Sequence, residues 1–292
     1  MSSGLVECVP NFSAGREAEV VSALAGAVRA SPGVWLLDAT ADPDHNRCVL
    51  TFAGQGEDVL EAAVRAARLA VERIDLRTQT GVHPRIGALD VLPFVPLEGA
   101  EMADCVALAE RAAARLWGEL GVPCYLYEAA ARVPERRDLA FVRSPEAGPP
   151  DVGQGCHASA GCAAVGARKV LIAYNVNLRT GDLEVARGIA RLVRARSGGL
   201  PCVKALGLPL ASRGQVQVSM NLTDYEVTPP HAAFLAVREA AHARGVEVAG
   251  SELIGLLPAR ALEMAAGVDL QWENFHGGLV LETRLAQARR AG

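Results

Sequence analysis

The sequence predicts an α+β protein built from two consecutive units of similar secondary structure. The chain has 292 residues, which is long for one small domain and suits two. Half of the residues are hydrophobic and 21% are charged, as is ordinary for a globular protein. Short apolar runs alternate with Ala-rich helical patterns, and the order of these patterns restarts near the middle of the chain.

The first half follows the order strand, helix, strand, strand, helix, strand. Apolar runs predict the strands, and apolar residues at helical spacing predict the helices, which end at Gly, Pro or Ser. The predicted strands are 5–10, 34–39, 47–52 and 91–95, and the helices are 17–30 and 57–73. A further helix, 102–120, and a strand, 124–127, follow. Residues 132–161 are rich in Pro, Gly and charge, which predicts a linker or loop.

The second half repeats this order. The predicted strands are 169–176, 202–208, 215–221 and 247–250, and the helices are 182–194, 229–244 and 258–266. The split β-α-β order is typical of a ferredoxin-like unit, an antiparallel sheet with helices on one face. We therefore expect two consecutive ferredoxin-like subdomains, residues 1–164 and residues 165–292.

Composition and motifs exclude several classes of function. With 29 Lys and Arg against 33 Asp and Glu, the chain lacks the basic footprint of a nucleic-acid-binding protein. Its seven cysteines are odd in number and show no CxxC spacing, which argues against a disulfide framework and a zinc site. No signal peptide, membrane-spanning run, P-loop, HExxH or GxSxG motif is visible. We expect a cytoplasmic protein that binds no metal, nucleic acid or membrane.

The most informative polar segment is residues 81–90, directly before a predicted strand. His83 precedes Pro84, and the proline favours extended backbone geometry at the histidine. Because the pKa of histidine lies near neutrality, His83 is the candidate to accept and donate a proton. Arg85 is a candidate to bind a carboxylate through two parallel hydrogen bonds. The alternative is structural: His83 caps a turn and Arg85 pairs with Asp90.

Three further segments are candidates for a binding site. Residues 38–47 gather three acids, a His, an Asn and an Arg in one turn, which favours a polar pocket over a solvated hairpin turn. Residues 153–168 contain several glycines that allow close backbone approach to a ligand, although the residues alone favour a flexible interdomain linker. Residues 215–222 alternate strictly, so that Gln, Gln, Ser and Asn share one face of a strand, as in a polar cleft or on a solvated sheet.

Taken together, these segments resemble the formiminotransferase family. The similarity extends over most of the chain and is carried by the following stretches: residues 5–13 (LVECVPNFS), 44–47 (DHNR), 83–90 (HPRIGALD), 165–168 (VGAR), 173–178 (AYNVNL), 217–222 (QVSMNL) and 250–256 (GSELIGL). The resemblance implies a homodimer with two ferredoxin-like subdomains per chain and a tunnel between them. It also implies transfer of a formimino group from N-formimino-L-glutamate to N5 of the co-substrate tetrahydrofolate, a step of histidine degradation and one-carbon metabolism.

The resemblance also assigns roles to residues. The family's catalytic histidine corresponds to His83, with Asp38 or Asp42 as the acid that orients it or stabilises charge. The expected substrate-binding residues are Asn11, His45, Asn46, Arg47, Arg85, Gln217 and Asn221. The expected folate-binding residues, in the loop 152–161, are Gly153, Gly155, His157, Ser159 and Gly161. Two alternatives remain open: a folate-dependent formyltransferase that uses N-formylglutamate, and a folate- or metabolite-binding homologue without catalysis.

Overall fold

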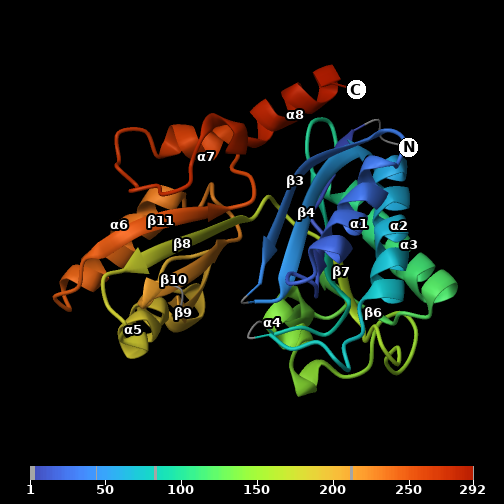
Figure 1. Cartoon of the computed structure of the whole chain (residues 1–292), viewed down its shortest axis with the longest axis horizontal. Coiled ribbons are helices and arrows are strands. Elements are labelled where there is room, and N and C mark those ends of the chain that lie inside the picture. The colour runs from blue at the N-terminus through green and yellow to red at the C-terminus, as the bar shows by residue number, and fades with distance from the viewer. Residues whose placement is uncertain (1–3, 44, 82–83, 211–212, 292) are drawn as a thin grey trace. The chain divides into compact units, whose positions relative to one another are not determined.

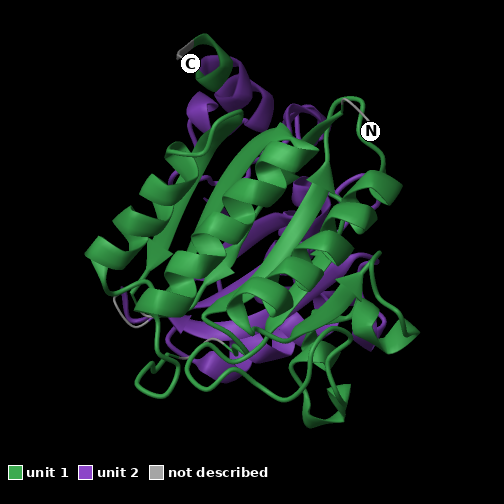
Figure 2. Ribbon diagram, turned by 90° about the vertical axis from the view of Figure 1, so that its right-hand side faces the viewer, with its two compact units in different colours: residues 1–169, 288–292 green, residues 170–287 purple. Residues whose placement is uncertain are grey.

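The structure is a computed structural model that describes residues 4–43, 45–81, 84–210 and 213–291. It divides the chain into two compact units, residues 1–169 with 288–292 (unit 1) and residues 170–287 (unit 2) (Figure 2). The expected boundary between residues 164 and 165 lies inside a strand of unit 1, and the division falls after Lys169. Both units combine helices with a β-sheet, so the predicted α+β class is confirmed.

Unit 1 contains a seven-stranded sheet (Figure 1). Its strands are β1 (Leu5–Cys8), β2 (Asn11–Phe12), β3 (Val34–Asp42), β4 (Arg47–Gln55), β5 (Leu89–Pro96), β6 (Cys124–Glu128) and β7 (Ala163–Ala167). Its helices are α1 (Ala18–Arg29), α2 (Gly56–Arg73), α3 (Met102–Leu120) and α4 (Leu139–Val142), with 3₁₀ turns η1 (Pro134–Arg137) and η2 (Pro145–Ala147). The sheet order is β1-β4-β2-β5-β7-β6, with β3 paired to β4 and β1 also paired to β5.

The expectation of a purely antiparallel sheet is wrong for unit 1. The β1–β4, β1–β5 and β3–β4 pairs are antiparallel, whereas β7 pairs in parallel with both β5 and β6. The strand β7 was not predicted, because its residues Ala-Ala-Val-Gly-Ala lack the β-branched and aromatic side chains that usually mark a strand. All five are buried, and a side chain on Gly166 would collide with Tyr127 of β6.

The predicted linker at 132–161 is also wrong in part. It contains η1, α4 and η2, and its buried side chains include Arg136 and Val142. Arg136 forms a 2.6 Å ion pair with Asp151, whose carboxylate also accepts a 2.8 Å hydrogen bond from the backbone N–H of Leu126 in β6. This segment is therefore folded against the sheet of unit 1.

The helices α1, α2 and α3 lie side by side across one face of the unit 1 sheet (Figure 2). Ala-rich faces of α2 and α3 pack on Cys48, Leu50 and Phe52 of β4 and on Phe94 of β5, so these side chains form a core on the helix-covered face. Alternate residues of the same strands face the other way. That second face, which we call the open face, carries the polar residues described below.

Unit 2 contains a four-stranded sheet of order β11-β8-β10-β9, in which all neighbours are antiparallel. The strands are β8 (Ile172–Leu178), β9 (Val203–Leu210), β10 (Gln215–Leu222) and β11 (Val248–Ile254). The helices are α5 (Leu183–Val193), α6 (Pro230–His242), α7 (Ala259–Met264) and α8 (Leu281–Ala291), with 3₁₀ turns at Ala195–Ser197 and Gly277–Leu279.

The core of unit 2 lies between its sheet and the helices α5 and α6. Tyr174 and Val176 of β8 and Val218 and Met220 of β10 face this core. The predicted alternation along 215–222 is confirmed, because the residues between these apolar positions lie on the opposite face of the sheet. Among the described residues, no helix has both the length and the apolar character needed to cross a membrane.

Candidate functional site

An ion cluster around Asp90 lies on the open face of unit 1. The Asp90 side chain is fully buried, and its Oδ2 accepts hydrogen bonds from Arg47 (Nη1, 2.7 Å) and Arg143 (Nη2, 2.6 Å). Its Oδ1 accepts from the backbone N–H of Ile86 at 2.8 Å. Arg47 also donates Nε and Nη2 to Oδ1 of Asn11, at 3.0 and 2.8 Å. One buried carboxylate thus meets two guanidinium groups.

The charges of this cluster do not cancel. Burial alone would raise the pKa of Asp90, but Arg47, Arg143 and the Ile86 N–H stabilise its charged form and hold the pKa below the ordinary Asp value. Asp90 is therefore ionised, and the two arginines leave one net positive charge on the three groups. Arg143 Nε is buried without a hydrogen-bond partner in the part of the chain that the structure describes. An arrangement of this kind favours an anionic ligand such as a carboxylate.

The predicted acids of β3 lie on the same open face. The register pairs Asp42 with Arg47 and Asp38 with Thr51, and directly paired residues of antiparallel strands point to the same side. Asn11 of β2 is paired with Val49, which points to the same side of β4 as Arg47 and Thr51, so Asn11 also lies on the open face. The structure therefore brings together four residues predicted from the sequence: Asn11, Asp38, Asp42 and Arg47.

The β3–β4 turn carries a His–Asp pair. His45 Nδ1 lies 2.8 Å from Asp42 Oδ2, and the His45 backbone N–H donates to Asp42 Oδ1 at 2.9 Å. Both side chains are partly exposed. This pair gives the site an imidazole oriented by a carboxylate, in addition to the predicted His83.

Asn46 ties the β3–β4 turn to two other segments of unit 1. Its backbone is left-handed, with φ of 49°, a conformation that Asn tolerates better than most residues. Its Oδ1 accepts from the N–H groups of Gly15 (2.9 Å) and Arg16 (3.2 Å). Its Nδ2 donates to the carbonyl of Thr80 (3.1 Å) and to Gln79. The amide is thus occupied by contacts within the protein.

Arg85 binds the same turn from the other side of residues 82–83. It donates Nη1 to the Asn46 carbonyl at 3.1 Å and Nη2 to the His45 carbonyl at 2.7 Å. The catalytic prediction at His83 lies outside the described residues. The described residues on both sides of it, Thr80 and Arg85, are each hydrogen-bonded to the β3–β4 turn.

The predicted folate loop also lies against this region of unit 1. His157 and Gly161 exchange two backbone hydrogen bonds of 3.0 Å and close a tight hairpin. Within it, His157 Nδ1 accepts from the N–H groups of Ser159 (3.3 Å) and Ala160 (3.0 Å). The Ala160 carbonyl accepts from Ala88 N–H at 2.9 Å. The loop is therefore an ordered part of the unit 1 fold.

Glycine is required at particular points of this loop. Gly153, Gly155 and Gly161 have positive φ angles of 82°, 66° and 68°, which favour glycine. A side chain on Gly161 would also collide with the Ile86 carbonyl. The glycines thus shape the hairpin and let it approach the segment that follows His83. Beside them, Sγ of Cys156 lies 3.1 Å from Sγ of Cys162.

On unit 2, the predicted residues Gln217 and Asn221 lie on the face of β10 that points away from α5 and α6. Gln217 is 4% exposed and is paired in register with Asn177 of β8, which is fully buried. Oε1 of Gln217 and both Nδ2 and Oδ1 of Asn177 have no hydrogen-bond partner among the described residues. A buried polar atom without a partner costs about 1–3 kcal/mol, which marks this pair as a candidate ligand contact.

Two candidate residues were missed by sequence reasoning. Arg143 lies in the segment taken for a linker, and no local pattern links it to Asp90, 53 residues away. Asn177 lies in the family-like stretch 173–178, for which the resemblance implies no role. The alternation along β8 was a usable signal, because Asn175 and Asn177 interrupt an otherwise apolar strand.

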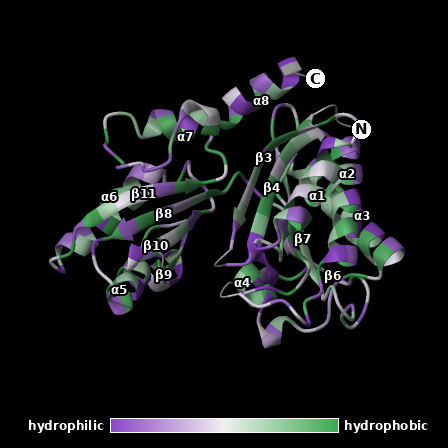
Figure 3. Cartoon of the chain, in the orientation of Figure 1, coloured by the Kyte–Doolittle hydropathy of each residue, from purple (hydrophilic) through white to green (hydrophobic). Residues whose placement is uncertain are grey.

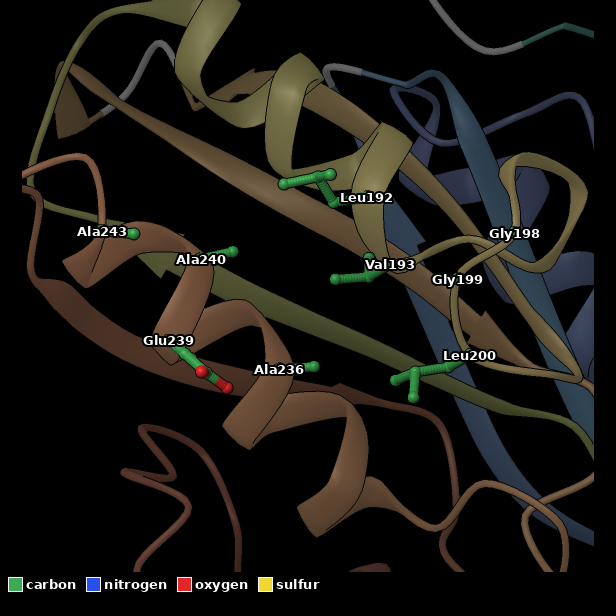
Figure 4. A pocket seen from close by; sticks show the side chains of 9 residues that line it. All are labelled: Leu192, Val193, Gly198, Gly199, Leu200, Ala236, Glu239, Ala240 and Ala243. Carbon is green, nitrogen blue, oxygen red and sulfur yellow. The ribbon is translucent and has the colours of Figure 1, made fainter.

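A groove of about 490 Å³ lies on the helix side of unit 2, between α5 and α6 (Figure 4). Its lining is apolar apart from Glu239, and includes Leu192, Val193, Leu200 and Ala236. It contains none of the predicted polar residues. By contrast, the turn end of β3 and β4 in unit 1 is strongly hydrophilic (Figure 3). In the described ranges, no three His, Cys, Asp or Glu side chains are grouped as a metal site requires.

Comparison with known proteins identifies the family. The model of the formiminotransferase domain, N-terminal subdomain, matches residues 5–168, and that of the formiminotransferase domain matches residues 173–280. The chain belongs to the formiminotransferase family. These matched ranges meet close to the division between units 1 and 2.

Named relatives extend the similarity over the whole chain. A glutamate formimidoyltransferase of Thermoplasma acidophilum is 42% identical over 97% of this chain and 98% of its own length. One of Streptococcus pyogenes is 41% identical over 93% of this chain and 95% of its own. The formimidoyltransferase-cyclodeaminase of Rattus norvegicus is 44% identical over 90% of this chain, which spans 52% of that longer protein.

Proposed function

We propose that this chain is a glutamate formimidoyltransferase, which moves the formimino group from N-formimino-L-glutamate to N5 of tetrahydrofolate. One observation carries the proposal: nearly full-length similarity, at 41–42% identity, to two proteins named for this activity. In both cases the similarity covers more than nine-tenths of this chain and of the relative.

The net positive charge of the Asp90 cluster supports a substrate with two carboxylates. Arg47 is held by Asp90 and Asn11, while Arg143 has a buried Nε–H without a partner in the described residues. We propose that Arg143 and Arg85 attract the carboxylates of formiminoglutamate. In this proposal Asn11 and Asn46 hold the site in shape, because their amides are occupied by contacts within the protein.

The reaction requires two proton transfers at nitrogen. A bond forms between N5 of the pterin and the formimino carbon, and the bond from that carbon to the glutamate nitrogen breaks. N5 loses a proton and the glutamate nitrogen gains one, so that no oxidant or reductant is consumed. A single imidazole can accept the first proton and donate the second, and such catalysis typically contributes about 10²–10⁴-fold.

We assign this proton transfer to His83. The described residues Thr80 and Arg85, which flank it in sequence, are hydrogen-bonded to the β3–β4 turn, and this turn carries the Asp42–His45 pair. Asp38 or Asp42 is the proposed partner that orients the imidazole or stabilises its charge. His45, already paired with Asp42 at 2.8 Å, is the competing candidate within unit 1.

The loop 152–161 is the proposed contact for tetrahydrofolate, the co-substrate. The left-handed glycines at 153, 155 and 161 expose backbone there, and the hairpin is bonded to residues 86–88 that follow His83. His157 and Ser159 complete the proposed contact. Burial of Ala160 in the core, with its backbone bonded at both ends, fixes the centre of this loop.

We further propose that each unit is ferredoxin-like. The β11-β8-β10-β9 order of unit 2, and the β3-β4-β1-β5 pairing within unit 1, support this classification. A cytoplasmic homodimer that binds neither nucleic acid nor membrane and needs no metal completes the proposal, on the basis of the family resemblance and the balanced charge.

The test is a direct assay with purified protein, tetrahydrofolate and N-formimino-L-glutamate, in which the product is converted by acid to the methenyl form and measured by absorbance. We expect turnover, and its loss in His83→Ala with unchanged circular dichroism. His242→Ala, an exposed histidine of α6, is the matched control and should keep full activity. Loss of turnover in His45→Ala but not in His83→Ala would transfer the catalytic role to His45.

The same assay separates the competing functions. Turnover with N-formylglutamate in place of the formimino compound would identify a formyltransferase. Tetrahydrofolate binding without turnover of either donor would identify a binding protein. Absence of both binding and turnover would contradict the proposal.

A further inference from the structure

Two buried side-chain amides of unit 2 have polar atoms without hydrogen-bond partners among the described residues. Asn177 of β8 and Gln217 of β10 are direct partners in the antiparallel register, so their side chains stand next to each other on one face. Both are more than nine-tenths buried. Asn177 Nδ2, Asn177 Oδ1 and Gln217 Oε1 are without hydrogen-bond partners within the described part of the chain.

These amides lie on the sheet face opposite α5 and α6. Their neighbours along the strands, Val176 and Val218, belong to the core against the helices, so the amides point the other way. On the same face of β10, Ser219 is half-buried and Asn221 is exposed. The pair therefore forms the deep end of a polar strip that becomes accessible toward Asn221.

The unpaired atoms specify the chemistry of a complementary ligand. They offer one N–H donor group and two carbonyl acceptors, so the ligand must present one acceptor and two donors. A carboxylate presents acceptors only and would face the two amide oxygens. A formimino group presents N–H donors and no carbonyl. The pyrimidinone edge of a pterin presents all three in a row: the 4-oxo group accepts, and N3–H and the 2-amino group donate.

Resting on the folate-dependent transfer proposed above, we infer that Asn177 and Gln217 bind the pyrimidinone edge of the pterin. Asn177 pairs with the 4-oxo group and N3–H through two parallel hydrogen bonds, as one amide pairs with another. Gln217 Oε1 accepts from the 2-amino group. Gln217 is thereby the residue that recognises the 2-amino group, and the inference uses residues of unit 2 alone.

Folic acid and 2-desaminofolic acid provide a matched pair of probes, because they differ only at the 2-position of this edge. The desamino compound lacks the N–H donor that Gln217 Oε1 would accept from, whereas the 4-oxo group and N3–H that face Asn177 are the same. By calorimetry on the full-length chain, wild type should bind folic acid about tenfold or more tightly than 2-desaminofolic acid.

The two amides should respond differently to substitution. In Gln217→Leu the two affinities should agree within about twofold, because the amide that binds the 2-amino group is gone. In Asn177→Leu both affinities should fall by a similar factor of about tenfold with their ratio kept, because both ligands carry the 4-oxo group and N3–H. Gln287→Leu, which removes an exposed amide of α8, should change neither affinity.

The outcomes separate this inference from the proposed function. If wild type binds folic acid and Gln217→Leu keeps the preference over 2-desaminofolic acid, or wild type shows no such preference, the inference is overturned while the folate site stands. If wild type binds neither compound nor tetrahydrofolate, the folate-dependent function itself fails. Should Gln217→Leu not fold, Gln217→Ser, which removes the amide without adding bulk, gives the same comparison.

Discussion

Arg47 and Asp90 are 43 residues apart in the sequence and are joined by an ion pair of 2.7 Å, in which the carboxylate is fully buried. This contact links the start of β4 to β5 and places a guanidinium group on the open face of unit 1. Arg143, which directly follows α4, donates to the same oxygen at 2.6 Å. Asp90 therefore holds in place Arg47 and also Arg143, which we assign to the substrate carboxylates.

Replacement of Asp90 by Asn should destabilise the protein strongly. The change removes the negative charge and leaves two largely buried guanidinium groups, with side chains 15% and 14% exposed, without compensation, which typically costs about 3–5 kcal/mol. Urea unfolding followed by circular dichroism measures the change in the free energy of unfolding. Asp75→Asn is the control, because it breaks the exposed Asp75–Arg77 pair and should have little effect. Equal effects of the two substitutions would contradict the role given to burial.

Acid should weaken the fold through the same carboxylate. The pKa of Asp90 in the folded protein lies below its ordinary value of about 3.9, so the unfolded chain takes up the proton first. The stabilisation is complete above that ordinary value and is lost as the pH falls from there through the lower folded pKa. Unfolding measured between about pH 6 and pH 2 should show this loss. In Asp90→Asn the slope over that range should be shallower, and an unchanged slope would assign the acid sensitivity to other groups.

Arg143→Met should weaken the affinity for formiminoglutamate. It removes the guanidinium whose Nε–H is buried without a described partner, while Asp90 remains paired with Arg47. We expect KM for this donor to rise about 10–100-fold, in the range expected for a charge-assisted hydrogen bond. Arg137→Met, at an exposed arginine of the same segment, should leave KM unchanged. A fall in kcat with constant KM would assign Arg143 to the chemical step instead.

Asn46→Asp should act on turnover through the position of its neighbours. The carboxylate can still accept from Gly15 and Arg16, but it cannot donate to the Thr80 carbonyl. Because Thr80 lies just before the proposed catalytic segment, we expect kcat to fall about 10²-fold, as for a small displacement of a reacting group. Steady-state kinetics with both substrates measures this. A change confined to the KM of formiminoglutamate would mean that Asn46 contacts the substrate directly.

The loop 152–161 should form an internal disulfide on oxidation. Cys156 and Cys162 flank the hydrogen-bonded His157–Gly161 pair, and their sulfur atoms are 3.1 Å apart, so a bond requires only a small movement. Burial raises the pKa of Cys162 to about 12, and exposed Cys156 is the thiol that meets an oxidant. Oxidised glutathione should yield a protein lacking two hydrogens, as seen by mass spectrometry. In Cys156→Ser that product should be absent; a stable glutathione adduct in wild type would argue against the internal bond.

Local patterns predicted the regular parts of this fold well. Helix 102–120 was predicted with the bounds observed for α3, because its Ala-rich periodicity ends at Gly121, which adopts the left-handed conformation. The alternation along β10 likewise identified the polar face that bears Gln217. In unit 1, the acids of β3 and Arg47 were correctly grouped as neighbours because one short turn joins their strands.

The remainder depends on contacts between distant parts of the sequence. The strand β7 carries only small residues and is defined by its parallel pairing with β5 and β6, which no local pattern reports. The pairing of Arg143 with Asp90 has the same origin. The position of Asn177 beside Gln217, and the lack of partners for its amide, depend on the pairing of β8 with β10 and could not be predicted from either strand alone.

The position of β7 determines how this protein can be dissected. A fragment that ends at residue 164 would keep only the first two residues of β7. The edges of β5 and β6 that pair with β7 would then be exposed, and exposed strand edges promote aggregation. A fragment that stops at residue 169 retains the complete strand. Truncations, split-protein reporters and domain fusions should therefore be made after Lys169 rather than at the glycine-rich loop that precedes β7.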